Sequence, residues 1–289
     1  MYGSLAQLEN DAASSDKPLW QIIMDDDAQD QGIRPQTDFN KMKSMYMAMK
    51  DSIAKYDPAL QSTSGLSGGD AGRLEAAAAH GRLIAGDFIT SVMGKALKVA
   101  ESNACMKRIV AAPTAGSCGI VPAVLISFQE RDPDTCTDDR MTEALYVAGG
   151  IGGVIARRAS LSGAEGGCQA EIGSASAMAA GALTYLRGGT PHQVFNASAL
   201  ALKGLLGLVC DPVCGLVEVP CIKRNVIGAV NAVTSSDMAV SGIESRIPAD
   251  EVIDAMKSVG RMMDGTLRET GKGGLAASET ARKLSESQE

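Results

Sequence analysis

Large aromatic side chains are nearly absent from this sequence, and their scarcity limits the folds that the chain can adopt. Phe, Trp and Tyr make up 3% of its 289 residues although 45% of the residues are hydrophobic, and glycine alone occupies 32 positions. A core with so few rings has to be filled by Ala, Val, Leu and Met, with backbones in close contact. This composition favours tightly packed helices with small residues at their crossings.

Helical hydrophobic patterns recur along the chain, whereas strand-like alternation is short and scarce. The predicted helices cover 38–55, 73–100 (with a break near Gly81 or Gly86), a segment that begins within 113–130, 140–158, 173–187, 191–208, 224–241 and 249–263. The best candidate strand is 217–220. We therefore predict a mainly α, compact helical fold that forms one domain over residues 1–289, with 1–17 and 278–289 loosely ordered.

Four glycines interrupt the predicted helix 140–158, namely Gly149, Gly150, Gly152 and Gly153. Glycine inside a helix costs about 1 kcal/mol relative to alanine. We therefore expect neighbouring elements to approach the backbone closely here.

Charge and hydropathy limit the compartment and the partners. The formal net charge is −7, and no stripe of Lys or Arg is present, which argues against nucleic acid or an anionic membrane as a partner. The first twenty residues lack the basic start and apolar run of a secretory signal. No stretch reaches the roughly 18–20 apolar residues that span a bilayer. We expect a cytoplasmic protein, in which thiols stay reduced.

Three of the seven cysteines fall within residues 210–221, CDPVCGLVEVPC. Disulfides, a metal site, a reactive thiol and simple core packing are the alternatives. The odd number of cysteines and the expected compartment argue against disulfides. No CxxC pair occurs, and neither His80 nor His192 has a useful spacing to a cysteine, which argues against a zinc site.

Cys168, Cys210 and Cys221 lie in segments rich in Gly and Pro. Three thiolates from such loops suit an iron–sulfur cluster, and the alternative is that each cysteine is a small buried hydrophobe. We assign that second role to Cys105 and Cys136, which stand alone in the sequence.

Three longer segments resemble the signatures of one family, the alpha subunit of iron–sulfur-dependent L-serine dehydratases. They are APTAGSCGIVPAVL (112–125), EGGCQAEIGSASAMAAGAL (165–183) and CDPVCGLVEVPCIKRN (210–225), and SGLSGGDA (64–71) and GKGGLA (271–276) match further segments. The resemblance extends from about residue 18 to residue 277.

This resemblance implies a [4Fe-4S] cluster held by Cys168, Cys210 and Cys221, with one iron left free to bind the substrate hydroxyl as a Lewis acid. The implied reaction converts L-serine to pyruvate and ammonia, in L-serine degradation and gluconeogenesis. Cys214 departs from the family pattern, either as a competing fourth ligand or as a space-filling residue, and we favour the second role.

The substrate carboxylate also needs an anchor. Thr114, Gly116 and Ser117 precede an apolar helix, and helix N-termini offer unpaired N–H groups. Ser64 and Ser67, in the Ser/Gly loop before Asp70, form a second candidate. Ordinary helix capping is the alternative at both places.

The base that removes the Cα proton is not evident from the sequence. Lys223 and His192 are the candidates, although both also fit structural roles at helix starts, and His80 lies in a helical context. The family also occurs as separate alpha and beta subunits, so the resemblance implies that a beta subunit supplies part of the site. Met42, Met45 and Met49 share a helical face, which we interpret as core packing, with docking of such a partner as the alternative.

Three other functions remain open. A related cluster lyase could act on another small amino acid, and an iron–sulfur scaffold or sensor would keep the cysteines without an activity. A pyridoxal-phosphate dehydratase would need a Schiff-base lysine within a βα sheet fold, and strands are scarce here.

Overall fold

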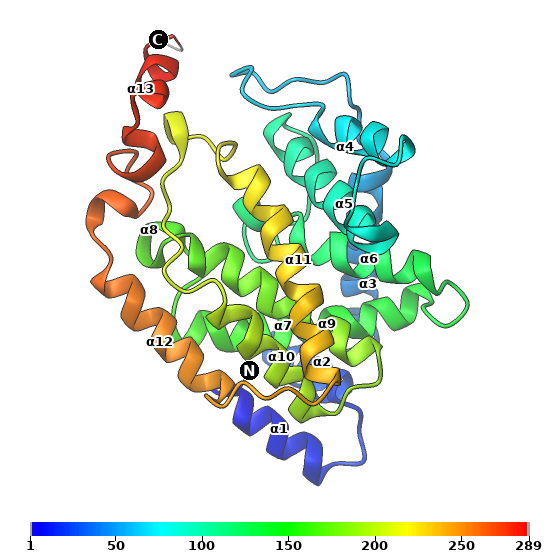
Figure 1. Ribbon diagram of the computed structural model, residues 1–289. Helices are drawn as coiled ribbons and strands as arrows, with labels where there is room; N and C mark the ends of the chain where they lie inside the picture. Colours follow the sequence, from blue (N-terminus) through cyan, green and yellow to red (C-terminus); the bar gives the residue numbers. More distant parts are fainter. Residues whose placement is uncertain (1, 288–289) are drawn as a thin grey trace.

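A computed structural model describes residues 2–287, and within this range the chain is helical, with no strand (Figure 1). The α-helices are α1 (Leu5–Ser14), α2 (Leu19–Gln31), α3 (Pro35–Ala54), α4 (Asp70–Ala79), α5 (Gly86–Ala104), α6 (Ile120–Arg131), α7 (Asp138–Arg158), α8 (Gly163–Gly166), α9 (Ser174–Leu186), α10 (Pro191–Lys203), α11 (Cys221–Val240), α12 (Ala249–Met262) and α13 (Glu279–Glu286). The mainly α prediction is confirmed. None of the helices between residues 2 and 287 combines the length and apolar character that crossing a bilayer requires.

The loops between these helices contain shorter helical turns. They are the 3-10 turns η1 (Ala115–Ser117), η3 (Val213–Gly215), η4 (Gly265–Leu267) and η5 (Gly274–Ala277), and the π-helical segment η2 (Gln169–Gly173). The strand predicted at 217–220 is wrong. This segment folds back on η3, with the Val213 N–H donating to the Val219 carbonyl at 2.8 Å, and then enters α11.

Helix α9 lies inside the bundle because its sequence, SASAMAAGALTYL, is small or apolar on every side. It packs against α6, α7, α10 and α11 (Figure 1). A Cβ atom at Gly181 would meet the Ile151 side chain of α7 and would lie 2.8 Å from Ser198 Oγ of α10. The helices therefore approach as closely as the shortage of aromatic residues predicts.

The glycines of α7 have two different surroundings. A Cβ atom at Gly150 would lie 2.7 Å from Ile23 Cδ1, and one at Gly152 would lie 2.9 Å from Met178 Sδ. These two positions confirm the expected close approach, whereas a Cβ atom at Gly149 would meet no atom within 4 Å.

Three aromatic residues meet where α2, α3 and α7 pack together. The rings of Trp20 and Phe39 make an edge contact at 5.9 Å, and those of Phe39 and Tyr146 stack at 6.3 Å. On α3, Met49 is buried in the core while Met45 remains exposed, so the methionine face is only partly used for packing.

The long helix predicted over 73–100 is two helices. The connection between α4 and α5 contains Gly81 and Gly86, both with positive φ (+65° and +71°), a conformation that glycine adopts without steric cost. The break therefore falls where the sequence suggested it.

Within the segments expected to be loosely ordered, residues 2–17 and 278–287 make specific contacts, and residues 1, 288 and 289 lie outside the described residues. In α1, Leu5 and Leu8 are buried, and the Leu5 N–H donates to Asp250 Oδ1 at 2.9 Å. Helix α13 packs against η3 and η5. The contacts of Leu5 with Asp250 and of α13 with η3 join residues far apart in the chain, so no local sequence pattern predicts them.

Candidate functional site

The three cysteines of the signature segments come from three different elements. Cys168 precedes η2, Cys210 lies in the loop after α10, and Cys221 is the first residue of α11. All are unpaired and buried, with 2%, 4% and 8% of their surfaces exposed. An isolated parallel bridge fixes Cys210: its N–H donates to the Leu267 carbonyl, and its carbonyl accepts from Glu269 N–H.

The three thiols are close enough for their charges to interact. Burial raises the pKa of Cys168 to about 12 and that of Cys221 to about 11, and burial also raises the pKa of Cys210. Buried thiols of this kind stay neutral unless a cation binds them. Among residues 2–287, no three His, Cys, Asp or Glu side chains gather closely enough to hold a single metal ion.

The other cysteines lie elsewhere. Cys118 is buried in the core, and burial raises its pKa to about 12. Cys136 is buried, and Cys105 is half-buried at the end of α5. Cys214 Sγ, in η3, lies 3.3 Å from Ser285 Oγ of α13. This contact favours a space-filling role for Cys214.

The turn at 114–117 forms one wall of the site. Thr114 and Ser117 form a reciprocal capping box around η1, and their hydroxyl oxygens are 3.0 Å apart. The Thr114 hydroxyl donates to Glu171 Oε1 at 2.7 Å, and a Cβ atom at Gly116 would lie 3.1 Å from the same oxygen. The carboxylate of Glu171 thus lies directly against the turn.

Glu171 also adjoins the cysteine loop. A Cβ atom at Gly163 would lie 2.7 Å from Glu171 Oε2 and 2.9 Å from Cys210 Sγ. Burial raises the pKa of Glu171, and the hydrogen bond from Thr114 opposes part of that rise. Glu171 lies in the π-helical segment η2, and π-helical turns are frequent at functional sites.

Asn225 joins the turn to Cys221. Its Oδ1 accepts from the Gly119 N–H at 2.8 Å, while its Nδ2 donates to the carbonyls of Gly116 and Cys221 at 2.8 and 2.9 Å. One fully hydrogen-bonded amide, itself buried, therefore holds the turn against the start of α11.

In the second candidate anchor, which contains Ser64 and Ser67, the hydroxyl of Ser64 is hydrogen-bonded to another side chain of the protein. Ser64 Oγ donates to Glu218 Oε1 at 2.9 Å and Ser62 Oγ to Glu218 Oε2 at 2.7 Å. The Ser67 hydroxyl is buried and makes no hydrogen bond. The helix that follows is capped, because Glu101 accepts from the N–H groups of Asp70 and Ala71.

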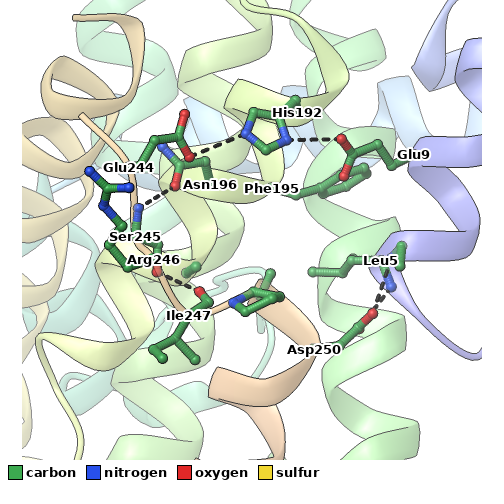
Figure 2. A pocket seen from close by; sticks show the side chains of 14 residues that line it. Leu5, Glu9, His192, Phe195, Asn196, Glu244, Ser245, Arg246, Ile247 and Asp250 are labelled. Atoms are coloured by element: carbon green, nitrogen blue, oxygen red, sulfur yellow. Dashed lines mark hydrogen bonds and ion pairs between the residues drawn. The ribbon is translucent and has the colours of Figure 1, made fainter. Parts of the chain in front are cut away.

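The two candidate bases are both paired with carboxylates. Lys223 extends to the surface and forms an ion pair with Asp70 of α4 at 2.5 Å. His192 belongs to a different pocket, of about 220 Å³, where its ring lies between Glu9 of α1 and Glu244 (Figure 2). Its side chain is 59% exposed. Both residues therefore serve contacts between helices.

Four polar residues that the sequence interpretation passed over contact the candidate residues or their chain neighbours: Glu171, Glu218, Arg224 and Asn225. All four lie inside the signature segments quoted for the cysteines. Polar residues within a cysteine-bearing signature were the available signal, but which of them face inward depended on the helical register around each loop.

Residues 14–276 match the family model described as serine dehydratase alpha chain. The chain is 50% identical over 247 residues to a probable L-serine dehydratase, alpha chain, of Bacillus subtilis, covering 85% of this chain and 81% of that one. It is 50% identical over 207 residues to the L-serine dehydratase, alpha chain, of Peptoniphilus asaccharolyticus, covering 71% and 69%.

A longer relative matches over part of its length. The L-serine dehydratase TdcG of Escherichia coli is 47% identical over 182 residues, which are 63% of this chain and 40% of that protein. The family match covers all three cysteine-bearing segments and the 114–117 turn. The chain belongs to the serine dehydratase alpha chain family.

Proposed function

We propose that this chain is the catalytic alpha chain of an L-serine dehydratase, a lyase that converts L-serine to pyruvate and ammonia. The observation that carries the proposal is the family match over residues 14–276, which contains a buried set of three mutually close thiols. The pyruvate so formed would be available for gluconeogenesis. The seven unpaired cysteines support a reducing, cytoplasmic location.

Cys168, Cys210 and Cys221 are the residues that would hold a [4Fe-4S] cluster. Cysteine thiolates are the usual ligands of such clusters, and three cysteines would leave one iron without a protein ligand. When bound, the cluster would supply a Lewis acid for the substrate hydroxyl. Because burial raises the thiol pKa values, cluster binding would release protons from these cysteines.

The amino-acid end of the substrate would be held by the 114–117 turn and Glu171. The first N–H groups of a helical turn have no acceptor within the turn, so the start of η1 at Ala115 suits a carboxylate. The Glu171 carboxylate beside them suits an ammonium group. The carboxylate and ammonium of an amino acid are bonded to the same carbon atom, so adjacent sites of opposite charge match serine.

The proton on Cα requires a base, and because Lys223 pairs with Asp70 while His192 contacts Glu9 and Glu244, we propose that another group provides it. Relatives are named alpha chains, and we propose a separate beta chain that completes the site. On this view the isolated chain binds the cluster but turns over serine weakly, and the partner restores the rate.

Pyruvate formation from L-serine, measured without oxygen after reconstitution with iron and sulfide, tests the proposal. We expect a brown protein whose absorbance bleaches in air, with weak activity that rises when the beta chain is added. A colourless protein without iron or sulfide would refute the cluster. Full activity from this chain alone would refute the partner requirement.

The same assay separates the alternatives. A cluster without pyruvate formation, even with the partner, would indicate a scaffold or sensor, and faster turnover of threonine or cysteine would indicate a related lyase. A yellow protein with a Schiff-base lysine would indicate pyridoxal phosphate, although the strand-free fold of residues 2–287 does not support the βα sheet of such enzymes.

A further inference from the structure

Arg224 is a buried cation directly behind the cysteine loop. It follows Cys221 by one turn of α11, and only 15% of its side chain is exposed. Nη1 donates to the Val209 carbonyl at 2.7 Å, and Nη2 lies 2.9 Å from Asp211 Oδ1. Since residues 209 and 211 flank Cys210, the guanidinium group is held against the backbone that carries this cysteine.

Asp211 is itself fixed from the other side. Its Oδ2 accepts the Leu275 N–H at 2.7 Å, and a Cβ atom at Gly274, where φ is +58°, would overlap its carboxylate. The 271–276 segment, which the sequence interpretation left without a role, therefore closes over this buried ion pair. A guanidinium held by an immobilised carboxylate and a carbonyl has little freedom to turn away from the site.

The guanidinium has five N–H donors, and its contacts with Val209 and Asp211 do not use them all. Burial raises the pKa of Cys168, and the positive charge of Arg224 opposes part of that rise. Its charge also lowers the pKa of Cys221. Lys223, the neighbouring cation, is turned toward Asp70 on the surface instead.

We propose that Arg224 is the counter-ion of the cluster: its guanidinium, held against Val209 and Asp211 on either side of Cys210, offsets the negative charge that the three cysteine ligands bring into a buried site. The inference rests on the proposed cluster. Hydrogen bonds to cluster sulfurs and the net charge of the site set the reduction potential, so Arg224 should raise that potential and retain the iron. Arg224 acts through the cysteines and is a positioning residue rather than a catalytic one.

The test compares Arg224→Gln, Arg224→Lys and Asp211→Asn after anaerobic reconstitution of the full chain, with Arg187→Gln as the control. Arg187 pairs with Asp237 at the far end of α9. Two readouts independent of turnover are the reduction potential of the cluster and the rate of iron loss to a chelator.

We expect Arg224→Gln to shift the potential to more negative values and to lose iron about 10- to 100-fold faster. Arg224→Lys should fall between Arg224→Gln and the natural protein. Asp211→Asn removes a negative charge from the same site, so its shift should have the opposite sign. Arg187→Gln should match the natural protein.

A natural potential and natural iron retention in Arg224→Gln would overturn the inference, as would shifts of the same sign in Arg224→Gln and Asp211→Asn. If Arg224→Gln does not fold, as judged by circular dichroism, the opposite signs of Arg224→Lys and Asp211→Asn decide the question. Failure of the natural protein to take up iron and sulfide would instead refute the proposed cluster.

Discussion

The Thr114 hydroxyl donates a 2.7 Å hydrogen bond to Glu171 Oε1 and so joins two signature segments that are 57 positions apart. The same hydroxyl lies 3.0 Å from Ser117 Oγ. Glu171 in turn adjoins Cys210 across Gly163. This relationship links the predicted carboxylate anchor to the cysteine site and gives Glu171 a place between them.

Thr114→Val and Ser117→Ala should each lower kcat/KM for serine. Losing a hydrogen bond to a charged group costs on the order of 1.5–3 kcal/mol, which is roughly ten- to hundredfold in kcat/KM. Steady-state kinetics of the reconstituted enzyme measure the effect. Unchanged kinetics in both variants would move the anchor elsewhere, and Ser64 and Ser67 would then be tested.

Replacing Cys168, Cys210 or Cys221 by serine should each abolish the cluster absorbance and the activity, because each thiol would bind a different iron. The matched controls are Cys105→Ser and Cys136→Ser, which should retain the cluster and lose no more than about 2 kcal/mol of stability. Iron content, visible spectra and urea unfolding provide the measurements. Full activity in Cys168→Ser would contradict the assignment.

Gly163→Ala should lower the activity of the reconstituted enzyme while the fold remains intact. The new methyl group would lie 2.7 Å from Glu171 Oε2 and 2.9 Å from Cys210 Sγ, and displacing catalytic groups by about 1 Å can cost about 100-fold in rate. Gly149→Ala is the control, since its methyl group meets nothing within 4 Å on a helix. That variant should keep its activity and gain up to about 1 kcal/mol in stability. Equal activities in the two variants would exclude a close contact at Gly163.

Glu218→Ala should destabilise the loop that carries the cysteines. It removes the buried carboxylate that accepts from Ser62 and Ser64, at an expected cost of about 1–3 kcal/mol. Glu244→Ala, at an exposed position of the His192 pocket, should cost about 0.5 kcal/mol or less. Urea unfolding at one pH compares them, and similar losses in both would argue against a special role of Glu218.

His192 should make stability depend on pH. Hydrogen bonds to Glu9 and Glu244 raise its pKa in the folded protein above the ordinary value of about 6.5. A raised pKa means that the folded state binds the proton more tightly. The stabilisation is therefore complete below the unfolded-state pKa and is lost as the pH rises through the folded-state pKa. Because the side chain is exposed, the effect should stay below about 1 kcal/mol.

Urea unfolding between about pH 5.5 and 8.5 measures this dependence. The difference in unfolding free energy between the natural protein and His192→Gln should be largest at the acidic end and shrink toward the alkaline end. A difference that grows with pH would show that the ring does not bind α1 through its charge.

Local patterns in the sequence predicted the helices and the cysteines that we propose as cluster ligands. The shortage of aromatic residues predicted close helix crossings, which Gly181 and Gly152 bear out, because packing density can be reached only by small residues when rings are missing. Hydrophobic periodicity located most helices to within a few residues. The signature segments identified Cys168, Cys210 and Cys221 together with the family.

Tertiary structure alone decided which polar residues face the site. Glu171, Arg224 and Asn225 lie in the same segments as the cysteines, yet Glu171 pairs with Thr114, 57 positions away, and Asn225 with Gly116, 109 positions away. Lys223 and Arg224 are adjacent in the chain, but successive residues of a helix point about 100° apart. One therefore reaches Asp70 at the surface while the other lies buried behind Cys210, and only the packing of α11 against the loops determines which is which.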